Sequence, residues 1–82
     1  MKVRINIALK KAVLDTQGKA IESVLNKNIG YSQISDVRQG KFVDLEIAET
    51  NQDNVKKIVD DICDKLLVNK IIEDYSFEIL KN

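Results

Sequence analysis

The chain has 82 residues, enough for one small domain over residues 1–82 that buries only about 60–65% of the surface its unfolded chain exposes. Thirteen basic and thirteen acidic residues cancel, which argues against a nucleic-acid partner because such proteins carry a basic surface. With no histidine and one cysteine, the sequence excludes an imidazole general base, a Ser-His or Cys-His nucleophile pair, an internal disulfide and the usual zinc ligand sets.

The remaining composition narrows the class of protein further. No apolar run has the length of a membrane span or the pattern of a signal peptide, so we expect a cytoplasmic protein without a membrane partner. The three glycines stand too far apart to form a phosphate-binding loop. We therefore expect no catalytic, cofactor-binding or metal-binding residues on this chain.

The first elements are a strand and a helix. Residues 3–9 alternate between apolar and polar side chains, the pattern of a half-buried strand. Asp15 is a candidate N-cap for a helix that continues to about Asn28, and Gly30 lies where that helix would end. The apolar face of this helix is formed by Ala20, Ile21, Val24 and Leu25.

A hairpin is predicted next. Residues 34–39 and 41–48 both alternate with a period of two, and Gly40 lies between them. This arrangement favours two short strands joined by a tight turn centred near Gln39 and Gly40.

The clearest periodicity lies in the second half of the chain. Thr50 or Asn51 is expected to cap an amphipathic helix, and Asn69 is expected to end it in the left-handed conformation. A last strand is predicted from about Asp74 to Leu80. The apolar stripe of the helix recurs at the three-and-four spacing of one helical face and consists of Val55, Ile58, Val59, Ile62, Cys63, Leu66 and Leu67.

The resulting order is βαββαβ. It predicts an α+β fold of the ferredoxin-like type, a two-layer sandwich with a four-stranded antiparallel sheet and both helices on one face. The first and third strands should be central. The opposite face of the sheet would be mostly polar with both signs of charge, and it could face either water or a second copy of the chain.

Two short stretches contain the candidate partner-interface residues. Glycine in the first turn of a helix costs up to about 1 kcal/mol relative to alanine, so Gly18 indicates that a neighbouring strand, a ligand or a partner approaches the backbone closely. In the predicted hairpin, Arg38 and Lys41 flank Gly40 and would project toward an acidic partner or toward water. The candidate interface residues are Asp15, Gln17, Gly18, Arg38 and Lys41.

Three stretches together resemble the PurS family, the small subunit of phosphoribosylformylglycinamidine synthase. They are Leu14–Gly18 with Ala20, then Asp36–Lys41, and Cys63–Asn69 running on through Ile72–Tyr75. The resemblance covers nearly the whole chain in order, spacing and length.

The resemblance implies a protein that catalyses nothing itself. It implies a homodimer or higher homo-oligomer that bridges a PurQ-type glutaminase subunit, which releases ammonia, and a PurL-type synthetase subunit, which uses ATP to convert formylglycinamide ribonucleotide to formylglycinamidine ribonucleotide. ATP, magnesium and glutamine would then be bound by the partner subunits, and ammonia would pass between them with the help of this chain.

Two alternatives stay open. The βαββαβ order and the turn from Asp15 to Gly18 also resemble an ACT domain, a regulatory module that binds small molecules near the turn from strand to helix. An acyl-phosphate hydrolase of the same topology is disfavoured, because residues 10–14 contain no glycine that would let backbone amides converge on an anion.

Overall fold

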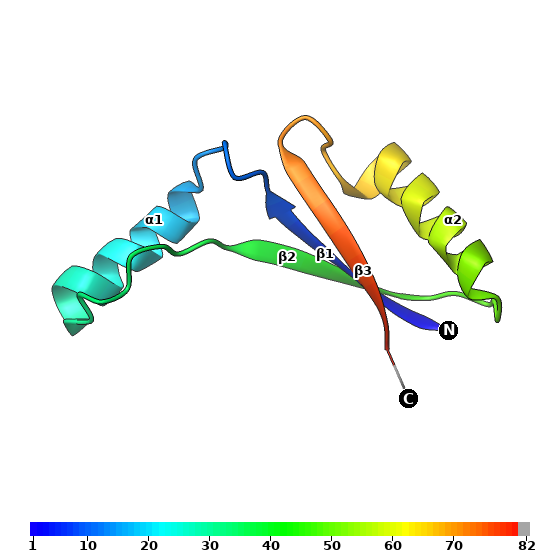
Figure 1. Ribbon diagram of the computed structural model, residues 1–82, viewed down its shortest axis with the longest axis horizontal. Coiled ribbons are helices and arrows are strands. Elements are labelled where there is room, and N and C mark those ends of the chain that lie inside the picture. The colour runs from blue at the N-terminus through cyan, green and yellow to red at the C-terminus, as the bar shows by residue number, and fades with distance from the viewer. Residues whose placement is uncertain (81–82) are drawn as a thin grey trace.

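The structure, a computed structural model, describes residues 1–80 and contains three strands and two main helices (Figure 1). Each helix ends in a wider, π-helical turn, labelled η. The elements are β1 (Lys2–Leu9), α1 (Thr16–Ser23), η1 (Val24–Ile29), β2 (Gly40–Glu46), α2 (Gln52–Ile62), η2 (Cys63–Leu67) and β3 (Glu73–Leu80). The α+β class is confirmed.

The sheet is antiparallel with the order β2-β1-β3. Strand β1 is central, as predicted, because the apolar side of its alternating sequence is completely covered: Val3 and Ile5 have no exposed surface and Ile7 has 2%. Ile5 lies opposite Val43 on β2 and Phe77 on β3, so the three strands present one apolar face together.

One of the four predicted strands, residues 34–39, is not formed, and the prediction of a hairpin at Gln39 and Gly40 was wrong. Residues 34–39 form an irregular segment, and β2 begins at Gly40. The backbone of this segment is engaged with the start of α1 instead: the Gln39 amide donates to the Asp15 carboxylate over 2.6 Å. As a consequence β2, the third of the four predicted strands, lies at an edge of the sheet and is not central.

Helix α2 covers the apolar face of the sheet. The Asn51 side chain caps it by accepting from the amides of Asp53 and Asn54, so Asn51 and not Thr50 is the N-cap. Val55, Val59 and Cys63, at every fourth position, are fully buried and form the core together with β1 and Val68.

The buried stripe of α2 is narrower than predicted. Ile58 is 36% exposed and Leu66 is 80% exposed. A three-stranded sheet with one helix on it covers a single row of side chains, and in the described part of the chain no second helix packs beside α2 to cover the flanking positions.

The end of this helix also differs from the prediction. Val68 is extended and ends the helical segment, and within residues 1–80 no residue other than glycine has a positive φ. Asn69 therefore is not left-handed. Its carbonyl oxygen instead accepts from the amide of Glu73 over 2.7 Å, in the turn that leads into β3.

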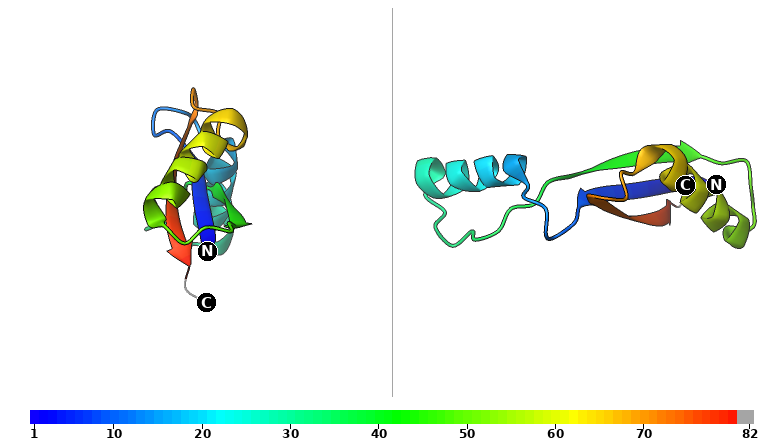
Figure 2. Two further views of the ribbon diagram at one scale, coloured as in Figure 1. Left: turned by 90° about the vertical axis from the view of Figure 1, so that its right-hand side faces the viewer. Right: turned by 90° about the horizontal axis from the view of Figure 1, so that it is seen from above.

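The first helix does not lie on the sheet, so the prediction of two helices on one face was wrong. Together α1 and η1 form what we call the arm (Thr16–Ile29), which extends beyond the end of the sheet, away from α2 (Figures 1 and 2). The Asp15 cap and the end at Gly30, which has φ +95°, are as predicted. No arm residue belongs to the buried core.

The molecule is elongated as a result. Its principal extents are 48, 31 and 15 Å, and its radius of gyration is 16.2 Å. A compact domain of this length has a radius of gyration of about 12 Å. Within residues 1–80 there is no helix with the length and apolar character that a membrane crossing requires.

Candidate functional site

The base of the arm, at the end of the sheet, brings the predicted interface residues together. A cleft of about 220 Å³ lies there, and its lining includes Asp15, Gln17, Gln39, Lys41 and Glu73. Gly18 and Arg38 adjoin it through direct hydrogen bonds to this region. Two stretches that are distant in sequence, with 24 positions between Asp15 and Gln39, thus form one structural unit.

Asp15 is the centre of this unit. It is only 5% exposed, and its two carboxylate oxygens accept from different segments: the Gly18 amide over 2.8 Å and the Gln39 amide over 2.6 Å. These hydrogen bonds, from Gln39 most strongly and then from Gly18, lower the pKa of the Asp15 carboxyl, and the nearby positive charge of Arg38 acts in the same direction.

Gly18 is required by close packing. A Cβ atom at this position would lie 2.1 Å from the carbonyl oxygen of Val37, far inside van der Waals contact. Of the explanations left open by the sequence for this costly glycine, the structure supports packing against the protein's own chain. Residues 37–39 return from the arm at this point.

Arg38 does not project from a hairpin tip. Its guanidinium group donates to the carbonyl oxygens of Lys10 (2.9 Å), Val13 (3.2 Å) and Leu9 (3.4 Å). It therefore joins the segment that returns from the arm to the segment that leads into it. We call the contacts of Asp15, Gly18, Val37, Arg38 and Gln39 the clasp.

Gln17 and Lys41 lie beside the clasp with more exposed side chains. Gln17 is exposed, and the Lys41 ammonium group lies 3.5 Å from a carboxylate oxygen of Glu73. Their role in binding a partner stays a prediction, as it does for Asp15, Gly18 and Arg38. The parts played by Val37 and Gln39 could not be seen in the sequence, because both residues contribute backbone atoms.

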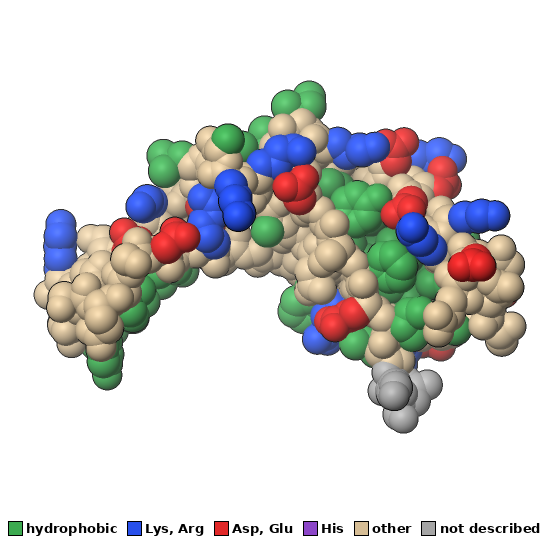
Figure 3. All heavy atoms as spheres, in the orientation of Figure 1, with side chains coloured by type: hydrophobic (Ala, Val, Ile, Leu, Met, Phe, Trp, Pro, Cys, Tyr) green, Lys and Arg blue, Asp and Glu red, His purple; other side chains and the backbone are tan. Residues whose placement is uncertain are grey.

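The arm carries an uncovered apolar face. Ala20, Ile21, Val24 and Leu25, the four residues predicted for this face, line a hollow of about 290 Å³. Ile21 is 41% exposed and Val24 is 49% exposed. In Figure 3 hydrophobic side chains gather along the lower edge of the arm, on the concave side of the molecule.

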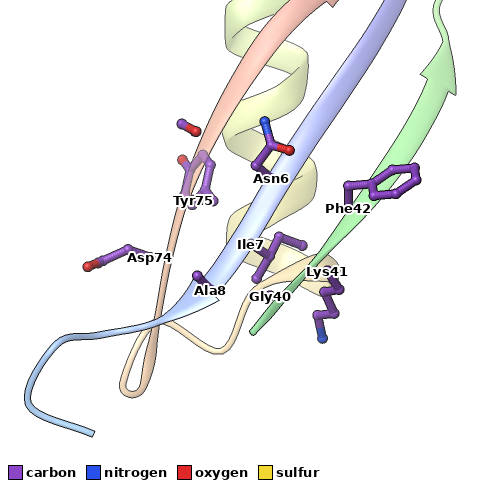
Figure 4. A pocket seen from close by; sticks show the side chains of 9 residues that line it. Asn6, Ile7, Ala8, Gly40, Lys41, Phe42, Asp74 and Tyr75 are labelled. Atoms are coloured by element: carbon purple, nitrogen blue, oxygen red, sulfur yellow. The ribbon is translucent and has the colours of Figure 1, made fainter. Parts of the chain in front are cut away.

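The face of the sheet opposite α2 is also uncovered. A shallow cleft of about 460 Å³ crosses all three strands there (Figure 4). Further along this face, Arg4 is paired with Asp44 through two hydrogen bonds of 2.9 and 3.1 Å and stacks 4.4 Å from the centre of the Phe42 ring. The ion pair lowers the pKa of the Asp44 carboxyl. The face is mostly polar with both signs of charge, as predicted.

Known proteins resemble the chain from end to end. The PurS family model, described as phosphoribosylformylglycinamidine (FGAM) synthase, matches residues 2–81. The phosphoribosylformylglycinamidine synthase subunit PurS of Bacillus subtilis is 40% identical over 78 residues, which is 95% of this chain and 90% of that protein. The chain belongs to the PurS family. The family indicated by the three sequence stretches is thereby confirmed, and an ACT domain is not favoured.

Solved structures of the PurS family agree in fold. The PurS of Methanocaldococcus jannaschii, described as one of the subunits of formylglycinamide ribonucleotide amidotransferase in the purine biosynthetic pathway, superposes with a TM-score of 0.85 at 37% identity, covering 99% of this chain and 96% of that one. A chain of the PurLQS structure from Thermotoga maritima gives 0.87 at 33% identity, covering 96% and 95%.

Proposed function

We propose that this chain is the small, non-catalytic subunit of phosphoribosylformylglycinamidine synthase in purine biosynthesis. The observation that supports this function most directly is the match to PurS proteins over nearly the whole of both chains. The similarity to a chain of the PurLQS structure supports a complex with a PurL-type synthetase subunit and a PurQ-type glutaminase subunit.

In this complex the chain holds the two larger subunits together so that ammonia released from glutamine reaches the synthetase. ATP, magnesium and glutamine are bound by the partners. We expect the complex to work in the cytoplasm.

The chain acts as a homodimer in this proposal. Its radius of gyration of 16.2 Å exceeds the value of about 12 Å for a compact domain of its length, and the apolar face of the arm is left open to solvent. Exposed apolar clusters of this kind mark interaction sites. In a two-fold pair the arm of each copy would bury this face against the other copy, with the same residues used twice.

A mixing experiment tests the proposed function. Purified synthetase and glutaminase subunits are run over a sizing column with and without this chain. We expect a single complex that contains all three proteins only when the chain is present. Synthetase and glutaminase that co-elute equally well without it would contradict the bridging role.

A further inference from the structure

We propose that the clasp sets the direction of the arm and that Asp15 is its positioning residue. The inference deepens the proposed function, because it rests on the arm being the element that meets a second copy of the chain. It concerns how the chain is prepared for pairing before any partner binds.

The arm has few other attachments to the body of the protein. Its residues take no part in the core, and the ion pair that Lys19 makes is with Glu22 inside the arm itself. Among the hydrogen bonds within residues 1–80, those at the base of the arm are centred on Asp15, which accepts from Gly18 and Lys19 of the arm and from Gln39 of the returning segment. Arg38 joins the returning segment to the segment that leads into the arm. The direction of the arm therefore depends on these few contacts.

Asp15 joins the two segments at the point where the arm leaves the sheet. One carboxylate oxygen holds the first turn of α1 through Gly18, and the other holds Gln39, directly before β2 begins. Gly40, the next residue, is paired with Ala8 on β1. A rotation of α1 about its base would thus have to break a hydrogen bond to a backbone that the sheet register fixes.

The other clasp contacts restrict the remaining movement. The absence of a side chain at Gly18 lets Val37 approach the helix, and the Arg38 guanidinium group ties the returning segment to the carbonyl oxygens of Lys10 and Val13. Two crossing segments held at three points form a rigid joint. Such a joint would preorganise the arm, which lowers the entropy cost of pairing with a second copy.

A graded series of substitutions separates positioning from general stability. Asp15→Ala removes both acceptors. Asp15→Asn keeps one acceptor and replaces the other with an amide donor, which cannot accept from a backbone N–H. The matched control is Asn51→Ala, which removes the corresponding cap of α2 and its hydrogen bonds from Asp53 and Asn54 without touching the arm.

The direct readout is the distance distribution between two spin labels, one at Lys27 on the arm and one at Lys57 on α2, both of which are exposed. The labels are attached to cysteines introduced at these two positions on a Cys63→Ala background, because Cys63 is fully buried and a serine hydroxyl there would lack a hydrogen-bond partner. The labelled chains also carry Ile21→Asp and Val24→Asp, which are expected to prevent pairing, so that the direction of the arm is measured before a second copy binds. Pulsed electron paramagnetic resonance then gives the distribution, while circular dichroism confirms that each variant is folded.

We expect one narrow distribution for the parent and for Asn51→Ala, a broadened one for Asp15→Asn and the broadest for Asp15→Ala. The dissociation constant of the homodimer, measured by sedimentation equilibrium, should rise about tenfold or more for Asp15→Ala relative to Asn51→Ala. Should Asp15→Ala fail to fold, the comparison of Asp15→Asn with Asn51→Ala decides.

An arm distribution for the Asp15 variants as narrow as that of the parent, or an equal broadening in Asn51→Ala, would overturn the inference. So would a broadened arm with an unchanged dissociation constant. A parent chain that stays monomeric at all concentrations would contradict the proposed homodimer instead, and the distance distributions would still decide whether the clasp holds the arm.

Discussion

The carboxylate of Asp15 accepts hydrogen bonds from two segments that are distant in sequence. It is the buried polar residue of the described chain that joins the arm to the sheet. Its first hydrogen bond is the ordinary one of a helix cap and was predicted from the sequence. Its second bond, to Gln39, depends on where the chain returns after the arm, which local sequence patterns do not encode.

The lowered pKa of Asp15 predicts an acid-sensitive contribution to stability. Because the pKa of this carboxyl is lower in the folded than in the unfolded chain, its contribution is fully present above the unfolded value of about 3.9 and is lost as the pH falls through the folded value. The difference in unfolding free energy between the parent and Asp15→Asn, measured by urea denaturation, should be constant from neutral pH to about 5 and shrink below about 4. The pKa values of Asp44 and Glu49 are also lowered, but both groups are present in the parent and in Asp15→Asn, so their contributions cancel in the difference. A difference that does not change with acid would contradict the role of the ionised carboxylate.

The hydrogen bond of Tyr75 leads to the opposite prediction, a contribution to stability that is lost at high pH. Its hydroxyl donates to Asp60 over 2.9 Å, and this hydrogen bond, together with burial, raises the pKa of Tyr75 to about 12. The contribution of the bond is therefore present up to about pH 10, the unfolded value, and is lost as the pH rises toward 12. Ultraviolet absorbance of the phenolate should show one ionisation near pH 12 that disappears in Tyr75→Phe. Ionisation of Tyr75 near pH 10 would show that the bond to Asp60 does not persist in solution.

At the scale of elements, the two helices differ in what covers their apolar faces. Both were predicted from an apolar periodicity, and both exist where the caps Asp15 and Asn51 start them. Periodicity identifies an apolar face but does not say what covers it. For α2 the cover is the protein's own sheet, whereas the face of α1 finds no cover within the described chain.

The missing strand has a related cause. Residues 34–39 have a suitable alternation, but a strand also needs a neighbour with free backbone groups. The clasp draws Val37 and Gln39 toward the base of the arm instead. The central position of β1, the order of the remaining elements and the buried side of the sheet were all predictable, since each follows from a contiguous pattern.

The core of α2 can be tested with two substitutions that the sequence pattern alone treats as equivalent. Val59→Asp places a carboxylate where the side chain is fully buried, at a cost of several kcal/mol, while small domains are stable by only about 5–15 kcal/mol. It should abolish soluble expression. Leu66→Asp, at a position that is 80% exposed, should remain folded with an unchanged circular dichroism spectrum. A folded Val59→Asp protein would show that α2 is placed wrongly.

The arm allows a complementary test of pairing. The double substitution Ile21→Asp and Val24→Asp puts two charges on the uncovered apolar face, so it should leave the core folded and raise the homodimer dissociation constant by about a hundredfold or more, equivalent to about 2.8 kcal/mol. Ser23→Asp adds a charge at an exposed position of the same helix outside this face and serves as the control. Sedimentation equilibrium gives both values. Unchanged pairing of the double variant would exclude the arm from the dimer interface.

At the scale of the whole molecule, the chain does not form a compact unit by itself. It is 48 Å long and 15 Å thin, with one face of its sheet and one face of its arm open. The family resemblance predicted partners from three sequence stretches, and the PurS match over residues 2–81 confirms the family. The open faces could not be predicted, because they result from the relative position of elements and not from any one of them.

The most direct test of the bridging role is the rate of formylglycinamidine ribonucleotide synthesis by reconstituted synthetase and glutaminase subunits, with glutamine or ammonia as the nitrogen source. We expect the glutamine-fed rate to fall about tenfold or more when this chain is left out, equivalent to at least about 1.4 kcal/mol, while the ammonia-fed rate is retained. A glutamine-fed rate that is the same with and without the chain would contradict the account.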